Sequence, residues 1–195
     1  MERRGLFELI REKYLPREVL YPGCSIHITP AFFFPYVVFV DQNPTAAAFF
    51  SNRDSIREFV GRNRKYRRTP HIQFIAQDFT QPLPVLENQF DLVLALFAGG
   101  IAKACRSYLR MGGLLLTNNH QNDAVDASED NQLVLLAIVQ KHQGKYRLEE
   151  KKPGESPKFK SQASRPKCYL WQTSGGLEYI ENESYYIFKR SRPRQ

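Results

Sequence analysis

Polar or small residues follow four short apolar runs of the sequence, at the points where strands of an α/β sheet would end. The residues are Gly23, Asp41, Asp78 and His120, and the runs before them are 19–21, 37–40, 72–76 and 114–117. In an open parallel sheet the carboxyl ends of the strands meet along one edge, where ligands bind. We therefore expect these residues to lie close together and to form a ligand site.

The residue types indicate what such a site would bind. Gly23 allows a tight turn and a close approach of backbone to ligand. Asp41 follows that turn at about 20 residues and offers its carboxylate to both hydroxyls of a ribose. Asp78 is suited to accept a hydrogen bond from an exocyclic amine, and Phe79 offers an apolar wall for a purine.

The elements that would position these residues alternate between strand and helix through residue 145, which indicates βαβ units and a mostly parallel sheet. Helices are expected at 3–14, 44–50, 54–65, 101–110 and 129–142, and further strands at 90–97, 146–148, 169–171 and 185–188. We expect residues 1–195 to form a single domain. It would consist of an N-terminal helical part (1–17), a ligand-binding βα core (18–145) and C-terminal strands (146–195) that give the sheet an antiparallel edge.

The formal net charge is +8, with 28 lysines and arginines against 20 aspartates and glutamates. The excess lies toward the two ends of the chain, including a loop at 151–167 and the tail, whereas the middle third is slightly acidic. The charge therefore does not mark the predicted site. Charge clusters of this kind are most often solvated surfaces, and a nucleic-acid contact through the basic loop and tail is the alternative.

Cysteine usage and apolar stretches bear on the compartment. The three cysteines, Cys24, Cys105 and Cys168, are odd in number and lack metal-ligand spacing, so we expect reduced thiols, no disulfide framework and no metal. The most apolar stretches, 30–40 and 92–102, are too short to span a bilayer. We expect a cytoplasmic protein that does not bind membranes.

The joint order of these motifs resembles the class I S-adenosylmethionine-dependent methyltransferases. The turn at 21–25, Tyr-Pro-Gly-Cys-Ser, is similar to the first motif of that family. Asp41 falls at its ribose-binding acid and Asp78-Phe79 at its adenine-contacting pair. Residues 90–95 resemble its fourth strand, and 108–116 resemble its helix, Gly-Gly and fifth strand. The chain most closely resembles a branch without an assigned substrate, marked by the Tyr-Pro-Gly turn and by Asn118-Asn119 followed by His and Asp.

The resemblance implies a Rossmann-like methyltransferase fold: a mostly parallel, seven-stranded sheet with an antiparallel edge strand and helices on both faces. It implies S-adenosylmethionine as the cofactor and a small molecule of unknown identity as the methyl acceptor. It also implies which residues bind the cofactor, namely Tyr21, Gly23, Cys24, Ser25, Asp41, Gln42, Asp78, Phe79, Leu96 and Phe97.

Methyl transfer from a sulfonium needs a positioned acceptor and, for some acceptors, a base that removes a proton. His120 and His27 are the candidate bases, and Asp123 would orient His120 if the segment turns back. Asn118 and Asn119 are candidate substrate contacts. The alternative is that residues 118–123 form a hydrogen-bonded loop that only shapes the pocket.

Other functions remain open at this stage. Ser25 and His27 stand where the family has further glycines, so one alternative is a non-catalytic binding protein with this fold and a degenerate cofactor motif. A nucleic-acid-associated methyltransferase is another. A nicotinamide dehydrogenase would need Gly-x-Gly-x-x-Gly after the first strand, which is missing. Amino-methylating nucleic-acid enzymes would show Asp/Asn-Pro-Pro-aromatic where residues 96–100 read Leu-Phe-Ala-Gly-Gly.

Overall fold

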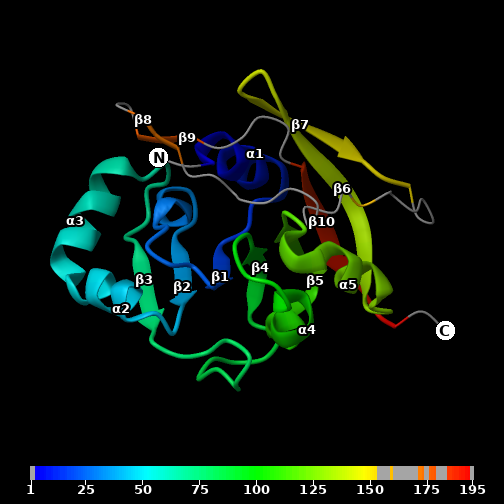
Figure 1. Ribbon diagram of the computed structural model, residues 1–195, viewed down its shortest axis with the longest axis horizontal. Coiled ribbons are helices and arrows are strands. Elements are labelled where there is room, and N and C mark those ends of the chain that lie inside the picture. The colour runs from blue at the N-terminus through cyan, green and yellow to red at the C-terminus, as the bar shows by residue number, and fades with distance from the viewer. Residues whose placement is uncertain (1–2, 153–158, 160–170, 174–175, 179–183, 194–195) are drawn as a thin grey trace.

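An eight-stranded twisted sheet forms the centre of the computed structural model, which describes residues 3–152, 159, 171–173, 176–178 and 184–193 (Figure 1). The strand order is β3-β2-β1-β4-β5-β10-β6-β7. The strands are β1 (Glu18–Pro22), β2 (Tyr36–Val40), β3 (His71–Ile75), β4 (Phe90–Ala95), β5 (Leu109–Thr117), β6 (Leu133–His142), β7 (Lys145–Glu150) and β10 (Ser184–Arg190). Two short strands, β8 (Trp171–Thr173) and β9 (Gly176–Glu178), pair with each other separately.

The first five strands are parallel, and the strand order reverses between β1 and β4. Such a reversal opens a binding position at the carboxyl ends of these two strands. β10 enters antiparallel between β5 and β6, and β7 pairs antiparallel with β6 at the far edge. The central strands β1, β2 and β4 are almost wholly buried, which explains why they are mostly apolar, with Glu18 of β1 and Asp91 of β4 as the charged exceptions.

Helices cover both faces of the sheet (Figure 1). One face packs against α1 (Arg4–Tyr14), the short 3-10 helix η1 (Thr29–Phe32), α2 (Pro44–Ser51) and α3 (Arg53–Asn63). The other packs against α4 (Ile101–Cys105), the 3-10 turn η2 (Arg106–Tyr108) and α5 (Asp123–Glu129). Successive strand residues alternate between the two cores: Val37 and Phe39 join the first, and Val38 and Val40 the second.

The predicted fold class is confirmed: the chain forms a single Rossmann-like α/β domain with a mostly parallel sheet, an antiparallel edge and helices on both faces. The predicted strand number is wrong, because the sheet has eight strands in place of seven. The sheet includes β6, in a segment for which the sequence predicted a helix. Of the strand predicted at 169–171, only Trp171 is described, and it belongs to β8, outside this sheet.

The prediction of a long helix at 129–142 is therefore wrong. Helix α5 ends at Glu129, and residues 133–142 form the ten-residue strand β6. Leu133, Leu136, Ala137 and Val139 also fit helical spacing, but the run is apolar on both sides. Ala137 and Val139 pack into one core and Leu133 into the other, as expected for a strand covered on both faces.

The predicted helix at 101–110 is shorter than expected. Helix α4 ends at Cys105, η2 follows, and β5 begins at Leu109. Gly113 lies within the strand, where an added β-carbon would come 3.0 Å from the carbonyl oxygen of Phe90 on β4. Gly113 therefore allows close approach of two strands, and the Gly-Gly pair does not end a helix.

Candidate functional site

The turn after β1 depends on Gly23. Its φ is +61°, a left-handed conformation that favours glycine, and a β-carbon added there would lie 2.7 Å from the β-carbon of Ala98. Ala98 belongs to the loop that follows β4. Glycine at this position therefore lets the turn after β1 touch the loop after β4, directly at the reversal of strand order.

Asp41, at the end of β2, holds this turn in place. One carboxylate oxygen accepts a hydrogen bond from the backbone N–H of Ser25 at 2.7 Å, and the other accepts one from the N–H of Asn43 at 2.8 Å. Asp41 remains partly exposed. A carboxylate has about four acceptor positions, so Asp41 retains capacity for two further donors from a ligand.

Asp78 and Phe79 follow β3 on the same side of the molecule. The carboxylate of Asp78 accepts a hydrogen bond from the N–H of Thr80 at 2.9 Å, and both Asp78 and Phe79 are partly buried. The Phe79 ring lies 3.7 Å from the position of a β-carbon on Gly23. Contacts within one small region thus link the glycine turn, Asp41 and Phe79.

His27 lies in a buried aromatic cluster. Its Nδ1 is 2.8 Å from the hydroxyl of Tyr21, and its ring packs edge-on against Tyr21 and Phe97 and tilted against Phe7 of α1. Tyr21 is also fully buried. These contacts join α1, β1 and the loop after β4, so His27 and Tyr21 form part of the buried support under the turn after β1.

Three other predicted cofactor residues have contrasting surroundings. Cys24 is fully buried, and desolvation raises the pKa of its thiol well above the usual range, so this thiol is not a nucleophile. Leu96 is a fully buried member of the core. Gln42 is exposed beside Asp41. Of the three, Gln42 alone presents its side chain to solvent.

Arg3 is a residue that sequence reasoning missed. It is buried, its Nε donates a hydrogen bond to the hydroxyl of Tyr185 at 2.6 Å, and its guanidinium lies 4.3 Å from the centre of the Phe97 ring. This contact brings a positive charge to the loop after β4. No local pattern signals it, because Tyr185 is 182 residues away in the chain.

The turn after β5 contains an unusual run of left-handed residues. Asn119, Gln121 and Asn122 have φ values of +60°, +50° and +66°, and none of them is glycine. Such conformations are disfavoured, although asparagine tolerates them best, and they persist only where surrounding contacts fix them. The side chain of Asn119 accepts a hydrogen bond from Ala124 N at 3.0 Å, and that of Asn118 accepts one from His120 N at 3.3 Å.

Asp123 anchors this turn to helix α4. It is fully buried, and its Oδ1 accepts a hydrogen bond from the N–H of Ala102 at 2.9 Å. Burial raises the pKa of Asp123 to about 6, against the opposing effects of the Ala102 amide and the Thr117 hydroxyl. Among the described residues no hydrogen bond joins Asp123 to His120, so the carboxylate acts on the turn as a whole.

His120 is the residue of this turn that has a titratable ring and is partly exposed to solvent. It is partly buried, and desolvation lowers the pKa of its imidazole below the usual value. The ring is therefore neutral at pH 7, the state in which imidazole accepts a proton. Asn118 and Asn119, in contrast, are buried and hold the backbone around it.

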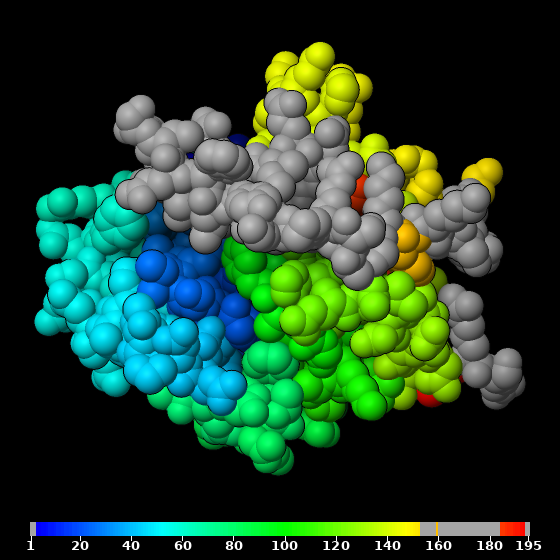
Figure 2. All heavy atoms as spheres, viewed as in Figure 1, coloured from blue at the N-terminus to red at the C-terminus, as the bar shows by residue number. Residues whose placement is uncertain are grey.

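The loop after β4 joins the two turns. Ala98 contacts the position of a Gly23 β-carbon, and a β-carbon on Gly99 would lie 2.5 Å from that of Gln121. In Figure 2 the blue, green and lime segments that follow β1, β4 and β5 meet on one face of the molecule. The structure thus brings the predicted residues to one edge of the sheet, as two groups with this loop between them.

The sequence also led to predictions about membrane spans, metal ligands and the basic segments. Among the described residues no helix is long and apolar enough to cross a membrane, and no three His, Cys, Asp or Glu side chains cluster as metal ligands would. Most of the basic loop at 151–167, together with Cys168, lies outside the described residues. In the tail, Arg190 donates hydrogen bonds to Asn88 and to the carbonyl oxygens of Ser107 and Leu109, so this arginine fastens β10 to its neighbours.

Comparison with known proteins reveals likeness in fold. No family model matches the sequence, and no curated protein matches it. The chain is similar to the N-methyltransferase NodS from Bradyrhizobium japonicum, at 14% identity over 98% of this chain and 96% of NodS, with a TM-score of 0.54. It is also similar to the tRNA methyltransferase TrmI from Aquifex aeolicus, at 11% identity over 100% of this chain and 70% of TrmI, with a TM-score of 0.55.

The chain has the class I methyltransferase fold. A third similar structure, the [4+2]-cyclase SpnF, shares 14% identity with a TM-score of 0.51, and the match covers 70% of this chain and 59% of SpnF. The class I methyltransferase fold therefore also carries a chemistry other than methyl transfer, so function has to be argued from the site itself.

Proposed function

We propose that this protein is an S-adenosylmethionine-dependent methyltransferase that acts on a small molecule. The observation that carries this proposal is the position of Asp41. Its partly exposed carboxylate stands at the end of β2, hydrogen-bonded to the glycine turn of β1, at the reversal of strand order in a class I methyltransferase fold. That position suits a ligand with a ribose.

The residues around Asp41 fit the adenosine half of the cofactor. Asp41 would accept the ribose hydroxyls, Asp78 would accept a hydrogen bond from the adenine amine, and Phe79 would pack against the base. All three are partly exposed at neighbouring positions along the strand ends. When bound, S-adenosylmethionine supplies a methyl group that its sulfonium has already activated for displacement.

His120 is the proposed base. Its lowered pKa favours the neutral imidazole, in which one of the two ring nitrogens can accept a proton, and the left-handed turn fixes its backbone beside the loop after β4. Asp123, Asn118 and Asn119 are positioning residues that hold this turn. His27 is buried among aromatic rings, which favours a positioning role for it as well.

Titration calorimetry with S-adenosylmethionine and with its demethylated product tests the cofactor assignment. We expect both to bind wild-type protein, and we expect Asp41→Ala to weaken both, because the substitution removes the ribose acceptor. If neither ligand binds wild-type protein at millimolar concentration, the proposal is wrong.

Substitution of His120 tests the assignment of the base once an acceptor has been found by screening small molecules for methyl incorporation. We expect His120→Ala to abolish turnover and to change cofactor affinity by less than severalfold. His142→Ala, at an exposed histidine on β6, is the matched control and should leave both unchanged. Wild-type turnover in His120→Ala would remove His120 from the mechanism.

A second candidate function is a non-catalytic binding protein with this fold. The contact of Gly23 with Ala98 favours it, because the turn after β1 packs directly on the loop after β4. Ser25 and His27 also replace the further glycines of the related motif. Binding of nucleosides or nucleotides without methyl transfer to any tested acceptor would support this second function.

A further inference from the structure

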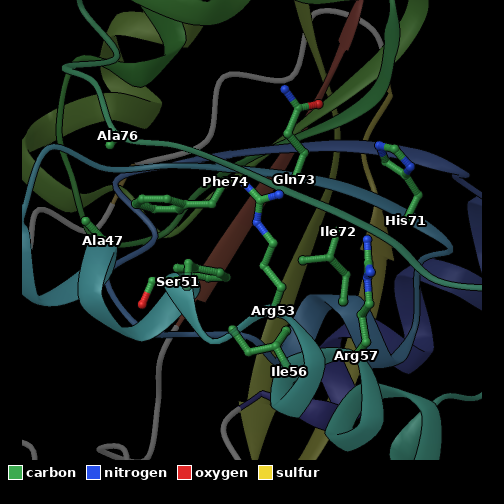
Figure 3. Close-up of a pocket in the computed structure, with 11 residues that line it drawn as sticks. Ala47, Ser51, Arg53, Ile56, Arg57, His71, Ile72, Gln73, Phe74 and Ala76 are labelled. Carbon is green, nitrogen blue, oxygen red and sulfur yellow. The ribbon is translucent and has the colours of Figure 1, made fainter.

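A hollow of about 410 Å³ lies along the free edge of the sheet, lined by residues of α2, α3 and β3. None of the residues assigned above to cofactor, substrate or base lines it. Its walls include Phe50, Arg53, Arg57, His71, Gln73 and Phe74. Figure 3 shows Arg53 and Arg57 running from α3 toward the strand, Arg53 toward Gln73 and Phe74 and Arg57 toward His71.

The outer edge of β3 has unpaired backbone groups. His71 N donates to Pro35 O at 2.8 Å, and Asp41 N donates to Ile75 O at 3.2 Å, so residues 71 and 75 direct their backbone groups toward β2. Alternate residues of an edge strand point opposite ways. Ile72 and Phe74 therefore direct their N–H and C=O groups outward, and among the described residues no strand pairs with them.

Two arginines of α3 flank this edge. Arg53 and Arg57 lie one helical turn apart on α3, both are exposed, and neither makes an ion pair or hydrogen bond with any other described residue. Arg62 on the same helix, in contrast, pairs with Glu58. Two adjacent unpaired guanidinium groups favour a ligand that brings carboxylates.

The floor of the hollow is apolar. The rings of Phe50 and Phe74 are stacked, with 4.6 Å between the ring centres and 6° between the ring planes. Ile72 packs beside them against the core. An extended peptide along this edge would place alternate side chains on the α3 side, within reach of the arginines. Backbone hydrogen bonds would provide affinity, and the charged wall would provide specificity.

We propose that the outer edge of β3 binds an acidic, extended segment of a partner protein as an added strand. The segment pairs with the outward backbone groups of Ile72 and Phe74, and its carboxylates engage Arg53 and Arg57. A second copy of this chain is disfavoured as the occupant, because pairing of two β3 edges would bring the arginines of both copies together.

Amide hydrogen exchange by NMR tests the strand addition, with the synthetic peptide acetyl-Glu-Val-Glu-Val-Glu-Val-amide as the probe. In the free protein the amides of Ile72 and Phe74 should exchange faster than those of His71 and Gln73, which are bonded to β2. Addition of the peptide should slow exchange at Ile72 and Phe74 and leave the other two unchanged. Lack of protection at saturating peptide would overturn the proposal.

Charge reversal tests the role of the arginines. The double variant Arg53→Glu with Arg57→Glu should have at least about tenfold lower affinity for the peptide. It should gain affinity for the matched lysine–valine peptide. Arg67→Glu with Arg68→Glu changes the net charge equally outside the hollow and should leave affinity within about twofold. Equal losses in both double variants would show a nonspecific charge effect and reject the site, as would a peptide-independent dimer seen by ultracentrifugation.

Discussion

The turn after β1 and the turn after β5 flank the same loop, but they are built by different means. The first has two left-handed residues, Gly23 and Ser25, and a single carboxylate, Asp41, ties two backbone amides together there. The second uses three left-handed residues other than glycine, held by buried asparagine and aspartate side chains. The first turn minimises side-chain bulk where a cofactor backbone contact is proposed, whereas the second fixes the position of one imidazole.

The two turns should therefore be disrupted by different kinds of substitution. The turn after β1 is sensitive to added volume, because Gly23 and Ala98 are in contact. The turn after β5 is sensitive to the loss of buried polar partners and to protonation, because its conformation depends on Asp123 and the two asparagines. Four substitutions test this contrast, and they follow in order of expected effect.

Gly23→Ala should have the largest effect. The new β-carbon would occupy a left-handed conformation and lie 2.7 Å from Ala98, so we expect a loss of about 3 kcal/mol in unfolding free energy and loss of cofactor binding. Gly100→Ala is the control: its φ is +76°, but no atom lies within 4 Å of the added carbon. Urea denaturation should show a smaller loss for Gly100→Ala, and equal losses would mean that the contact with Ala98 is unimportant.

Asp123→Asn should change the pH dependence of stability. The pKa of Asp123 is about 6 in the folded protein, above its ordinary value of 3.8, so folding favours the protonated carboxyl. This contribution is complete below pH 4 and is lost as pH rises through 6, by about 3 kcal/mol in total. Asparagine keeps the acceptor for Ala102 N without titrating, and the slope of unfolding free energy between pH 4 and 8 should flatten. An unchanged slope would contradict the assignment.

Asp41→Asn should have an intermediate effect. The amide retains one acceptor oxygen for either Ser25 or Asn43 and loses the other, together with its charge. We expect a loss of about 1–2 kcal/mol in unfolding free energy and a weaker interaction with ribose-containing ligands. Asp54→Asn, at an exposed acid in the first turn of α3, is the control: it should cost less than about 1 kcal/mol in unfolding free energy and leave ligand binding unchanged. Thermal unfolding and calorimetry measure the two properties, and equal behaviour of the variants would contradict the role of Asp41.

Gln121→Gly should have the smallest effect and the opposite sign. Its φ is +50° and its side chain is exposed, so glycine removes conformational strain but makes the unfolded chain more flexible. We expect a gain of less than about 1 kcal/mol in unfolding free energy. A clear destabilisation in urea would mean that the contact of Gln121 with Gly99 outweighs the strain of the turn.

Local sequence was sufficient to predict most of the sheet and which residues follow the carboxyl ends of its strands. Val37 to Val40 are β-branched or aromatic without interruption, and Leu92 to Ala95 form a continuous apolar run, which is typical of strands covered on both faces. Asp41 directly follows the first of these strands, and Asp78 lies three residues after the end of β3. The prediction of a helix through 133–142 was wrong because an apolar run that is buried on both faces fits helical and strand spacing alike.

The sequence by itself determined the alternation of strands and helices, the glycine turn and the acids at the strand ends, because each of these depends on neighbouring residues in the chain. Only the tertiary structure decided which turns touch, that Arg3 reaches Phe97 and Tyr185, and that Asp123 accepts a hydrogen bond from α4. It also decided that, among the described residues, no strand pairs with the outer edge of β3 and no side chain pairs with the two arginines beside it. These features join residues far apart in sequence. Burial, distance and unmet hydrogen-bonding capacity define them, and a linear pattern contains none of these quantities.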